Sequence, residues 1–137
     1  MELSEALFSL FHAVRNNISQ QVKLLDPDLS LMHMKSLKMI SSIEDCTGQK
    51  LADFMGRDKA QINRLIKQLV NQDLLIKTDN KNDGRSQILS LTQRGKDFIT
   101  KFNRVEKQVF NKMTDGLPQA QLDNFIQLAQ TFRNNLK

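Results

Sequence analysis

The segment spanning residues 57–92 constrains the fold most, because a basic amphipathic helix there runs directly into a two-stranded hairpin. Asp58 can cap a new helix and Gln61 can return a bond to the capping residue, so we expect the helix to begin near Lys59. Apolar residues at helical spacing predict its buried side: Ile62, Leu65, Ile66 and Leu69. Its outward side is predicted to carry Arg57, Ala60, Arg64, Lys67 and Asn71.

After this helix the pattern changes to that of two short strands. LLIKT and RSQILSL flank the polar stretch DNKNDG, which predicts a hairpin with Asp83 and Gly84 at the tip of its turn. Before the helix, Thr47 can cap a short helix, GQKLADFMG, in which Gly56 is the last residue. The order predicts a winged helix-turn-helix, in which the helix from Lys59 is the reader helix and the hairpin is the wing.

Apolar spacing and end signals predict the remaining helices. They are residues 3–24, a helix capped by Ser30 and running to about Ile43, a long helix capped by Thr92 and stopping near Gly116, and a last helix with Pro118 in its first turn. The fold class is therefore mainly α with a small β-hairpin wing (α+β). We expect one domain over residues 1–137, with a winged helix-turn-helix lobe at 30–95 and a helical dimerisation region at 1–25 and 96–137.

The positive charge is concentrated in the centre of the chain. Residues 48–101 hold eleven basic and six acidic residues, so the whole net charge of +5 falls there, while the flanks are balanced. This placement favours a central segment that meets a polyanion such as double-stranded DNA. The alternative left open by charge alone is a solvated basic face with no partner.

The terminal helices carry more apolar surface than the central lobe can cover. We therefore expect a homodimer built from both ends of the chain. Dimerisation would place two reader helices on one face, roughly 34 Å apart if they occupy successive major grooves.

The order of these motifs resembles the MarR-type winged helix-turn-helix regulators. LSLMHMKSLKMI is similar to their second helix, KLADFMGRDKAQINRLIKQLVNQDLL to their helix-turn-helix, Asp83-Gly84-Arg85 to the wing's Asp-x-Arg, and LTQRG to the start of the next helix. The resemblance implies a homodimer that binds an inverted-repeat operator and represses. It also implies a small-molecule effector, often phenolic or lipophilic, that relieves repression.

Three residues depart from the family pattern. Ala60 and Gln61 stand where the family prefers Ser or Thr, so a hydroxyl contact to phosphate is missing. Asp73 stands where the family has a glycine with positive φ, a conformation that Asp tolerates better than most residues.

The candidate DNA-binding residues follow from the pattern and the resemblance. In the reader helix they are Arg57, Lys59, Ala60, Gln61, Asn63, Arg64 and Lys67, and in the wing they are Lys81, Asp83, Arg85 and Ser86. Gln61 and Asn63 suit bidentate contacts with adenine, Arg64 suits guanine or phosphate, and the remaining cations suit phosphates. The resemblance places Arg85 in the minor groove, oriented by Asp83. For Gln61 and Asn63 the alternative is a solvated helix face without a partner. For Arg85 and Asp83 it is an ordinary surface ion pair worth under about 1 kcal/mol.

Other residues are candidates for sensing or ligand binding. Cys46 follows Glu44 and Asp45, whose charge should disfavour a reactive thiolate, and one cysteine excludes an intramolecular disulfide. His12 and His33 are too few for a metal site. Five Met and Phe side chains are either effector-pocket lining or, as we expect, core: Phe8, Phe11, Met32, Met34 and Met39.

No cofactor and no catalytic residue are expected, because the nucleophile–base and phosphate-cradling patterns of enzymes are missing. The N-terminus resembles neither a signal peptide nor a membrane span, so we expect no membrane partner and a cytoplasmic protein, associated with the bacterial nucleoid when bound to DNA. A winged helix used only for protein interaction is the alternative function, although a basic reader face would then be unnecessary.

Overall fold

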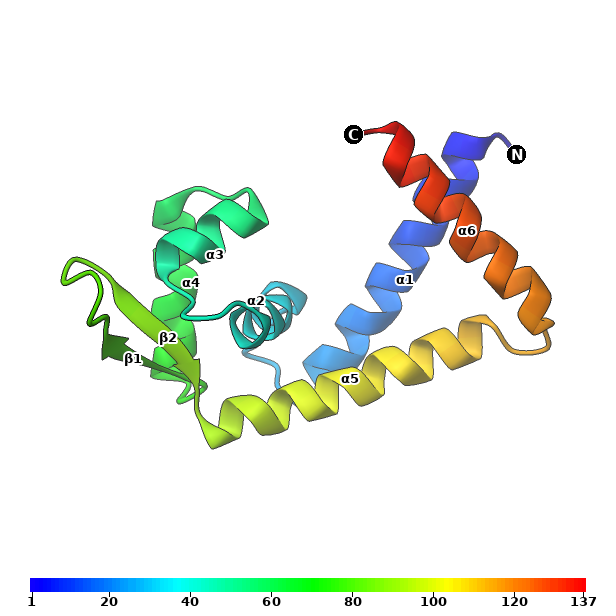
Figure 1. Ribbon diagram of the computed structural model, residues 1–137. Coiled ribbons are helices and arrows are strands. Elements are labelled where there is room, and N and C mark those ends of the chain that lie inside the picture. The colour runs from blue at the N-terminus through cyan, green and yellow to red at the C-terminus, as the bar shows by residue number, and fades with distance from the viewer.

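The computed structural model describes residues 1–137 and places a winged lobe at one end of a long helix, α5 (Figure 1). The elements in chain order are α1 (Leu3–Leu25), α2 (Leu31–Ser42), α3 (Gly48–Met55), α4 (Lys59–Asn71), β1 (Leu75–Asp79), β2 (Gln87–Leu91), α5 (Gln93–Met113) and α6 (Gln119–Asn135). The mainly helical fold with a hairpin wing is confirmed. None of the helices has the length and apolar character needed to cross a membrane.

Short polar side chains begin the helices of the lobe, as their positions predicted. The side-chain oxygens of Ser30, Thr47 and Thr92 accept from the backbone amides three residues on, and so satisfy donors that have no partner within the helix. Asp58 caps α4 by accepting from the amide of Ala60, but Gln61 makes no return bond, so the reciprocal capping arm predicted there is wrong.

The wing is a two-stranded antiparallel sheet with a fragment of a third strand. Leu75 pairs with Leu91 and Asp79 with Gln87, so the wing loop is residues 80–86. On the outer side of β2, the amide of Leu89 donates to the carbonyl oxygen of Cys46 at 2.7 Å, next to an isolated bridge between Thr47 and Ile88. The segment between α2 and α3 is thereby joined to the wing.

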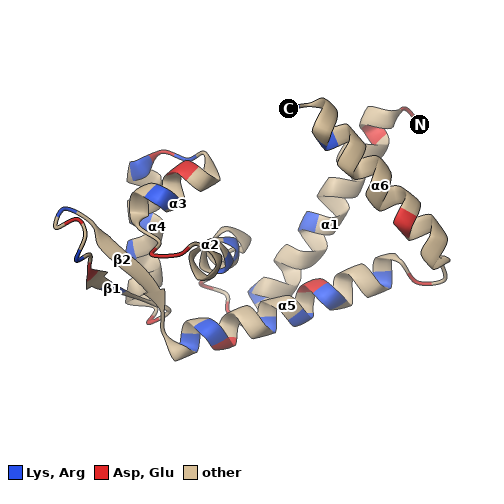
Figure 2. Cartoon of the chain, viewed as in Figure 1, with Lys and Arg blue, Asp and Glu red and all other residues tan.

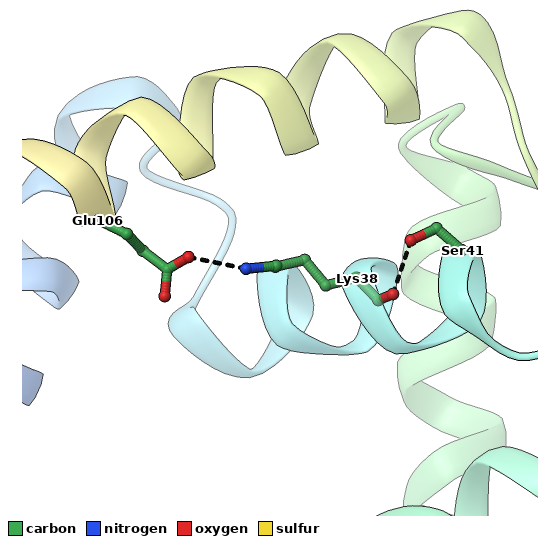
Figure 3. A network of polar contacts seen from close by, with 3 residues as sticks. All are labelled: Lys38, Ser41 and Glu106. Carbon is green, nitrogen blue, oxygen red and sulfur yellow. Dashed lines mark hydrogen bonds and ion pairs between the residues drawn. The ribbon is translucent and has the colours of Figure 1, made fainter. Parts of the chain in front are cut away.

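One core joins the winged lobe to the long helices. Its buried residues include Leu37 and Ile40 of α2, Leu69 of α4, Leu89 of β2 and Phe102 of α5. The α2 helix packs against both α5 and β2, and α1 packs against α5. At the rim, the ammonium of Lys38 lies 2.7 Å from a carboxylate oxygen of Glu106, which ties α2 to α5 (Figure 3). The same ammonium lies 5.3 Å from the centre of the Phe102 ring.

The ends of the chain leave apolar side chains uncovered. No residue of α6 is buried, and both termini lie away from the winged lobe (Figure 1). The expectation that Phe8 and Phe11 belong to the core is wrong, since they are 63% and 56% exposed. Met34 is buried as expected, and Met32 and Met39 pack against the core. The two phenylalanines are exposed because they lie on the part of α1 that extends beyond the lobe.

Candidate nucleic-acid interface

The reader helix α4 is positioned by a tight turn and by its own apolar side. Gly56 adopts a left-handed conformation (φ 61°) that ends α3, and the amide of Arg57 donates back to the carbonyl oxygen of Ala52 at 3.0 Å. The four apolar residues predicted to face inward are all buried: Ile62, Leu65, Ile66 and Leu69. The basic residues of α4 and of the wing are therefore left on the surface of the lobe (Figure 2).

The exit from α4 fixes the base of the wing. Asp73 has a φ of 59°, which confirms the left-handed conformation predicted for this position. The amide of Leu74 donates to Leu69 and the amide of Asp73 to Val70, the paired bonds of a Schellman motif. The hydroxyl of Thr92 donates to the carbonyl oxygen of Asp73 at 2.6 Å, so one helix end is tied to the start of the next.

The wing loop is closed by side chains. Asn80 donates to the hydroxyl oxygen of Ser86 at 3.1 Å, and a carboxylate oxygen of Asp83 accepts from the backbone amide of Arg85 at 3.0 Å. Asp83 therefore holds the backbone of Arg85, and it makes no ion pair with the guanidinium. Asp83 and Gly84 lie in this loop as predicted, and the amide of Ser86 donates to the carbonyl oxygen of Asp83 at 3.2 Å, although Gly84 does not have a positive φ.

The candidate contact residues of α4 lie on two flanks of the helix. On the wing side, a hollow of about 170 Å³ is lined by Lys59 and Asn63 of α4 together with Lys77, Arg85 and Ser86 of the wing. We call it the α4–wing hollow.

On the opposite side, a groove of about 260 Å³ is lined by Arg57, Gln61, Arg64, Gln68 and Met32. We call it the α2–α4 groove. Gln61 and Asn63, which were predicted to share base reading, therefore lie on opposite flanks. Their two-residue separation corresponds to a rotation of about 200° around a helix.

The remaining candidates lie outside both depressions. Ala60 and Lys67 are exposed on α4 between the two flanks, and Lys81 and Asp83 are exposed in the wing loop. Sequence reasoning missed Lys77, which enters the hollow because it lies on the face of β1 that also carries buried Leu75. The two-residue alternation of the strand was the available signal.

The cations of this surface have no acidic partners. The two ion pairs of the structure join Lys38 to Glu106, and Arg94 to Asp26 at 3.7 Å. Neither involves α4 or the wing. The positive charge at the α4–wing hollow and the α2–α4 groove is thus free to meet an external anion.

Cys46 is a core residue with 1% exposure. Burial raises the pKa of its thiol, and the nearby charge of Lys50 opposes part of that rise. The direction agrees with the expectation of a poorly ionised thiol. Its cause differs, because desolvation is responsible and not the charges of Glu44 and Asp45.

His33 lies half-buried between α2 and α4. The amide of Ser30 donates to Nδ1 at 2.9 Å, and Nε2 lies 2.7 Å from an oxygen of Gln68. Both ring nitrogens are therefore used in hydrogen bonds. His12 lies on α1 beside Phe11, and no group of three or more metal-ligating side chains comes together in the structure.

A cavity of about 370 Å³ lies between α1, α2 and α5. Its apolar wall includes Phe11, Ile18, Leu31, Met32 and Phe110. Its charged lining consists of three cations, Arg15, Lys35 and Arg57, and of the carboxylate of Glu106, which is paired with Lys38. Arg57 is shared with the α2–α4 groove, so the cavity borders the candidate interface.

A helix-turn-helix with a basic second helix, followed by a basic hairpin anchored to the same core, defines the winged helix-turn-helix class. Comparison with known proteins narrows the class. Residues 29–87 match the profile of the MarR family. The HTH-type transcriptional regulator SarZ of Staphylococcus epidermidis is 26% identical over 132 residues, which cover 95% of this chain and 88% of SarZ.

Solved structures share the fold along the whole chain. A mutant form of MarR from E. coli superposes with a TM-score of 0.83 at 17% identity and 96% coverage of both chains. MepR of S. aureus, solved in complex with DNA, superposes with a TM-score of 0.82 at 13% identity and 98% coverage of both chains. The chain is therefore similar to the MarR-type winged helix-turn-helix regulators in sequence over residues 29–87, and it shares their fold along its whole length.

Proposed function

We propose that this protein is a sequence-specific, double-stranded DNA-binding regulator that represses from an inverted-repeat operator as a homodimer. The main observation behind this proposal is that the cations on both flanks of α4 and in the wing form no ion pair within the protein. Such a surface suits a polyanion. The shared fold with MepR, which was solved bound to DNA, supports the same kind of partner. Such a regulator acts in the cytoplasm and is associated with the bacterial nucleoid when it is bound to DNA.

In this proposal the reader helix enters the major groove and the wing reaches the adjacent minor groove. Gln61 and Arg64 share the flank that borders the α2–α4 groove, and together they suit contacts with base edges. Arg57 and Lys67 contact phosphates. Arg85 enters the minor groove from a loop whose backbone Asp83 fixes.

Fluorescence anisotropy with labelled duplexes tests DNA binding directly. The protein is titrated into its own upstream DNA and into random DNA of the same length, at several salt concentrations. We expect tighter binding to the upstream DNA and affinity that falls steeply with salt, because bound phosphates release counterions. Failure to bind either duplex would leave only a protein-interaction role for the winged helix.

We infer that the uncovered apolar faces of the terminal helices form the dimer interface, as expected for the regions 1–25 and 96–137. Phe125, Ile126 and Phe132 of α6 are 41–54% exposed. Apolar residues of α1 are exposed to a slightly greater extent, for example Phe8 at 63% and Phe11 at 56%. Exposed apolar area of this extent is unusual for a monomer. A second copy of the chain would cover both helices at once.

Sedimentation equilibrium at micromolar concentration tests the dimer. We expect twice the chain mass for the wild type and a shift towards the monomer for Phe125→Asp, which places a charge in the proposed interface. Phe54→Asp is a matched control, because Phe54 is comparably exposed but lies on α3. A wild-type protein that stays monomeric would overturn the homodimer.

We infer that a small lipophilic or phenolic molecule relieves repression by binding in the cavity between α1, α2 and α5. The apolar wall suits an aromatic ring, and Arg15, Lys35 and Arg57 suit an acidic head group. Since Arg57 also borders the candidate interface, a ligand that holds its side chain would withdraw a phosphate contact.

Titration of the protein–DNA complex with 4-hydroxybenzoate, followed by anisotropy, tests this relief. We expect release of DNA by the wild type and by Arg104→Gln, and weaker release by Arg15→Gln. Arg104 is an exposed arginine of α5 that does not line the cavity. Equal release by all three proteins would place the ligand elsewhere.

A further inference from the structure

The α4–wing hollow collects residues from four separate parts of the chain, one of which is the start of α3 with Thr47, Gly48 and Gln49. Lys59 and Asn63 come from α4, Lys77 and Gln87 from the two strands, and Arg85 from the wing loop. The register pairs Lys77 with Leu89, and the hollow is also lined by the apolar side chains of Leu89 and Ile66. The wing thus contributes a cation from its sheet as well as from its loop.

The hollow is electropositive without an internal counterion. No Asp or Glu lines it, and neither ion pair of the structure uses its three cations. Asp79 lies two residues beyond Lys77 on β1 but does not line the hollow. Amide groups on Asn63 and Gln87 add hydrogen-bond donors. A site of this composition suits an oxyanion of one phosphate group.

The geometry of duplex DNA determines which phosphate would arrive there. The major and minor grooves are adjacent and are separated by the backbone of one strand. If α4 occupies the major groove and the wing occupies the neighbouring minor groove, that backbone must cross between α4 and the wing. The α4–wing hollow lies at this crossing.

We infer that the α4–wing hollow binds one backbone phosphodiester of DNA, with Lys77 as a phosphate ligand. The inference rests on the proposed DNA-binding function. It also changes the role of Asn63, which lies in the hollow, from reading bases to holding the backbone. Base reading by α4 then falls to its other flank, where Gln61 and Arg64 lie.

The first test is the salt dependence of DNA binding by Lys77→Gln. Lys107→Gln is the matched control, because Lys107 is an exposed lysine of α5 outside the hollow. We expect Lys77→Gln to lower the slope of log K against log salt by about one per protomer. The affinity should fall by the same factor on upstream and random DNA, while Lys107→Gln keeps both slopes. An unchanged slope for Lys77→Gln would overturn the inference.

The second test removes the charge from the DNA. Single methylphosphonates are placed one by one along each strand of the upstream duplex. We expect one position per half-site at which neutralisation weakens the wild type but has no further effect on Lys77→Gln. If every position weakens both proteins equally, Lys77 holds no phosphate. Steep, specific binding by the wild type would then still support the proposed regulator, whereas absent binding would remove the regulator itself.

A free anion is the other source of the same chemistry. Inorganic phosphate is titrated into the protein at constant ionic strength while amide NMR signals of the hollow are followed. We expect weak shifts, with no saturation at millimolar phosphate. Saturable binding that Lys77→Gln abolishes, combined with unchanged DNA affinity, would assign the hollow to a free anion and overturn the backbone assignment.

Discussion

The Nε2 atom of His33 lies 2.7 Å from the side-chain oxygen of Gln68, which joins α2 to the reader helix. The amide of Ser30 donates to Nδ1 of the same ring, so Nδ1 is the acceptor and Nε2–H donates to the side-chain oxygen of Gln68. No other side chain of α4 hydrogen-bonds within the protein. One imidazole ring therefore links the cap of α2 to the flank of α4.

We expect His33→Ala to lower the free energy of unfolding by about 1–2 kcal/mol and Gln68→Ala by about 1 kcal/mol, because the histidine ring loses its bonds to Ser30 as well as the bond to Gln68, whereas the glutamine loses one bond. Urea unfolding of both single variants and the double variant gives the coupling energy. Asn71→Ala, at an exposed residue of α4 without a side-chain bond, should change little. Strict additivity of the two substitutions would show that the bond contributes nothing.

Gly95 is required for the close approach of α5 to the end of α4. An added Cβ would overlap the carbonyl oxygen of Leu74, so we expect Gly95→Ala to destabilise the protein by about 1–3 kcal/mol. Helix propensity alone predicts the opposite, a gain of up to about 1 kcal/mol. Gly84→Ala is the control, since open space surrounds Gly84 and its φ is not positive. Thermal unfolding of both variants decides which effect dominates.

Asp73 adopts the left-handed conformation at a small cost. Asp73→Gly should raise the stability by up to about 1 kcal/mol, because relief of this strain exceeds the extra entropy that glycine brings to the unfolded chain. Asp73→Val should destabilise by about 1–2 kcal/mol, since a β-branched residue tolerates positive φ poorly. Denaturant midpoints measure both. A destabilised glycine variant would show that the Asp73 side chain contributes an unseen contact.

The Cys46 thiol should react slowly in the folded protein. Burial keeps it protonated and inaccessible, so we expect labelling by a disulfide reagent at about pH 8 to proceed only as fast as the protein opens, and to accelerate in urea. Rapid stoichiometric labelling of the native protein would contradict this.

The same thiol should contribute to the pH dependence of stability. Its folded-state pKa is raised, so the stability that it contributes is present below the ordinary thiol pKa of about 8.5 and is lost as the pH rises towards the folded-state value. Stability profiles of the wild type and Cys46→Ala should therefore differ in slope above about pH 8.5. Parallel profiles would contradict the prediction.

Local signals predicted the helices of the lobe accurately. Ser30, Thr47, Asp58 and Thr92 cap where expected, because capping depends on a few neighbouring backbone groups. The positive φ of Asp73 followed from its position at a helix end. Asp83 and Gly84 lie in the wing loop as predicted, but the bond between the side chains of residues 80 and 86 that closes this loop had no local signal.

Features that depend on tertiary neighbours were harder to predict from the sequence. The apolar stripe of α1 was recognised, but periodicity does not say what covers it, so Phe8 and Phe11 were placed in the core. Lys77 was missed because strand alternation predicts which face of the wing its side chain lies on, but not that α4 lies next to that face. Gln61 and Asn63 were paired because both face outward, although helical rotation already separates them.

The hydrogen bond between Leu89 and Cys46 and the bond between Thr92 and Asp73 leave the wing and α4 little freedom relative to each other. The winged lobe should therefore move as a rigid body, so that its affinity for DNA depends on its position and not on its internal conformation. In the proposed dimer, a regulator would then act by changing the distance between the two lobes. Labels on α4 of each copy would measure that distance.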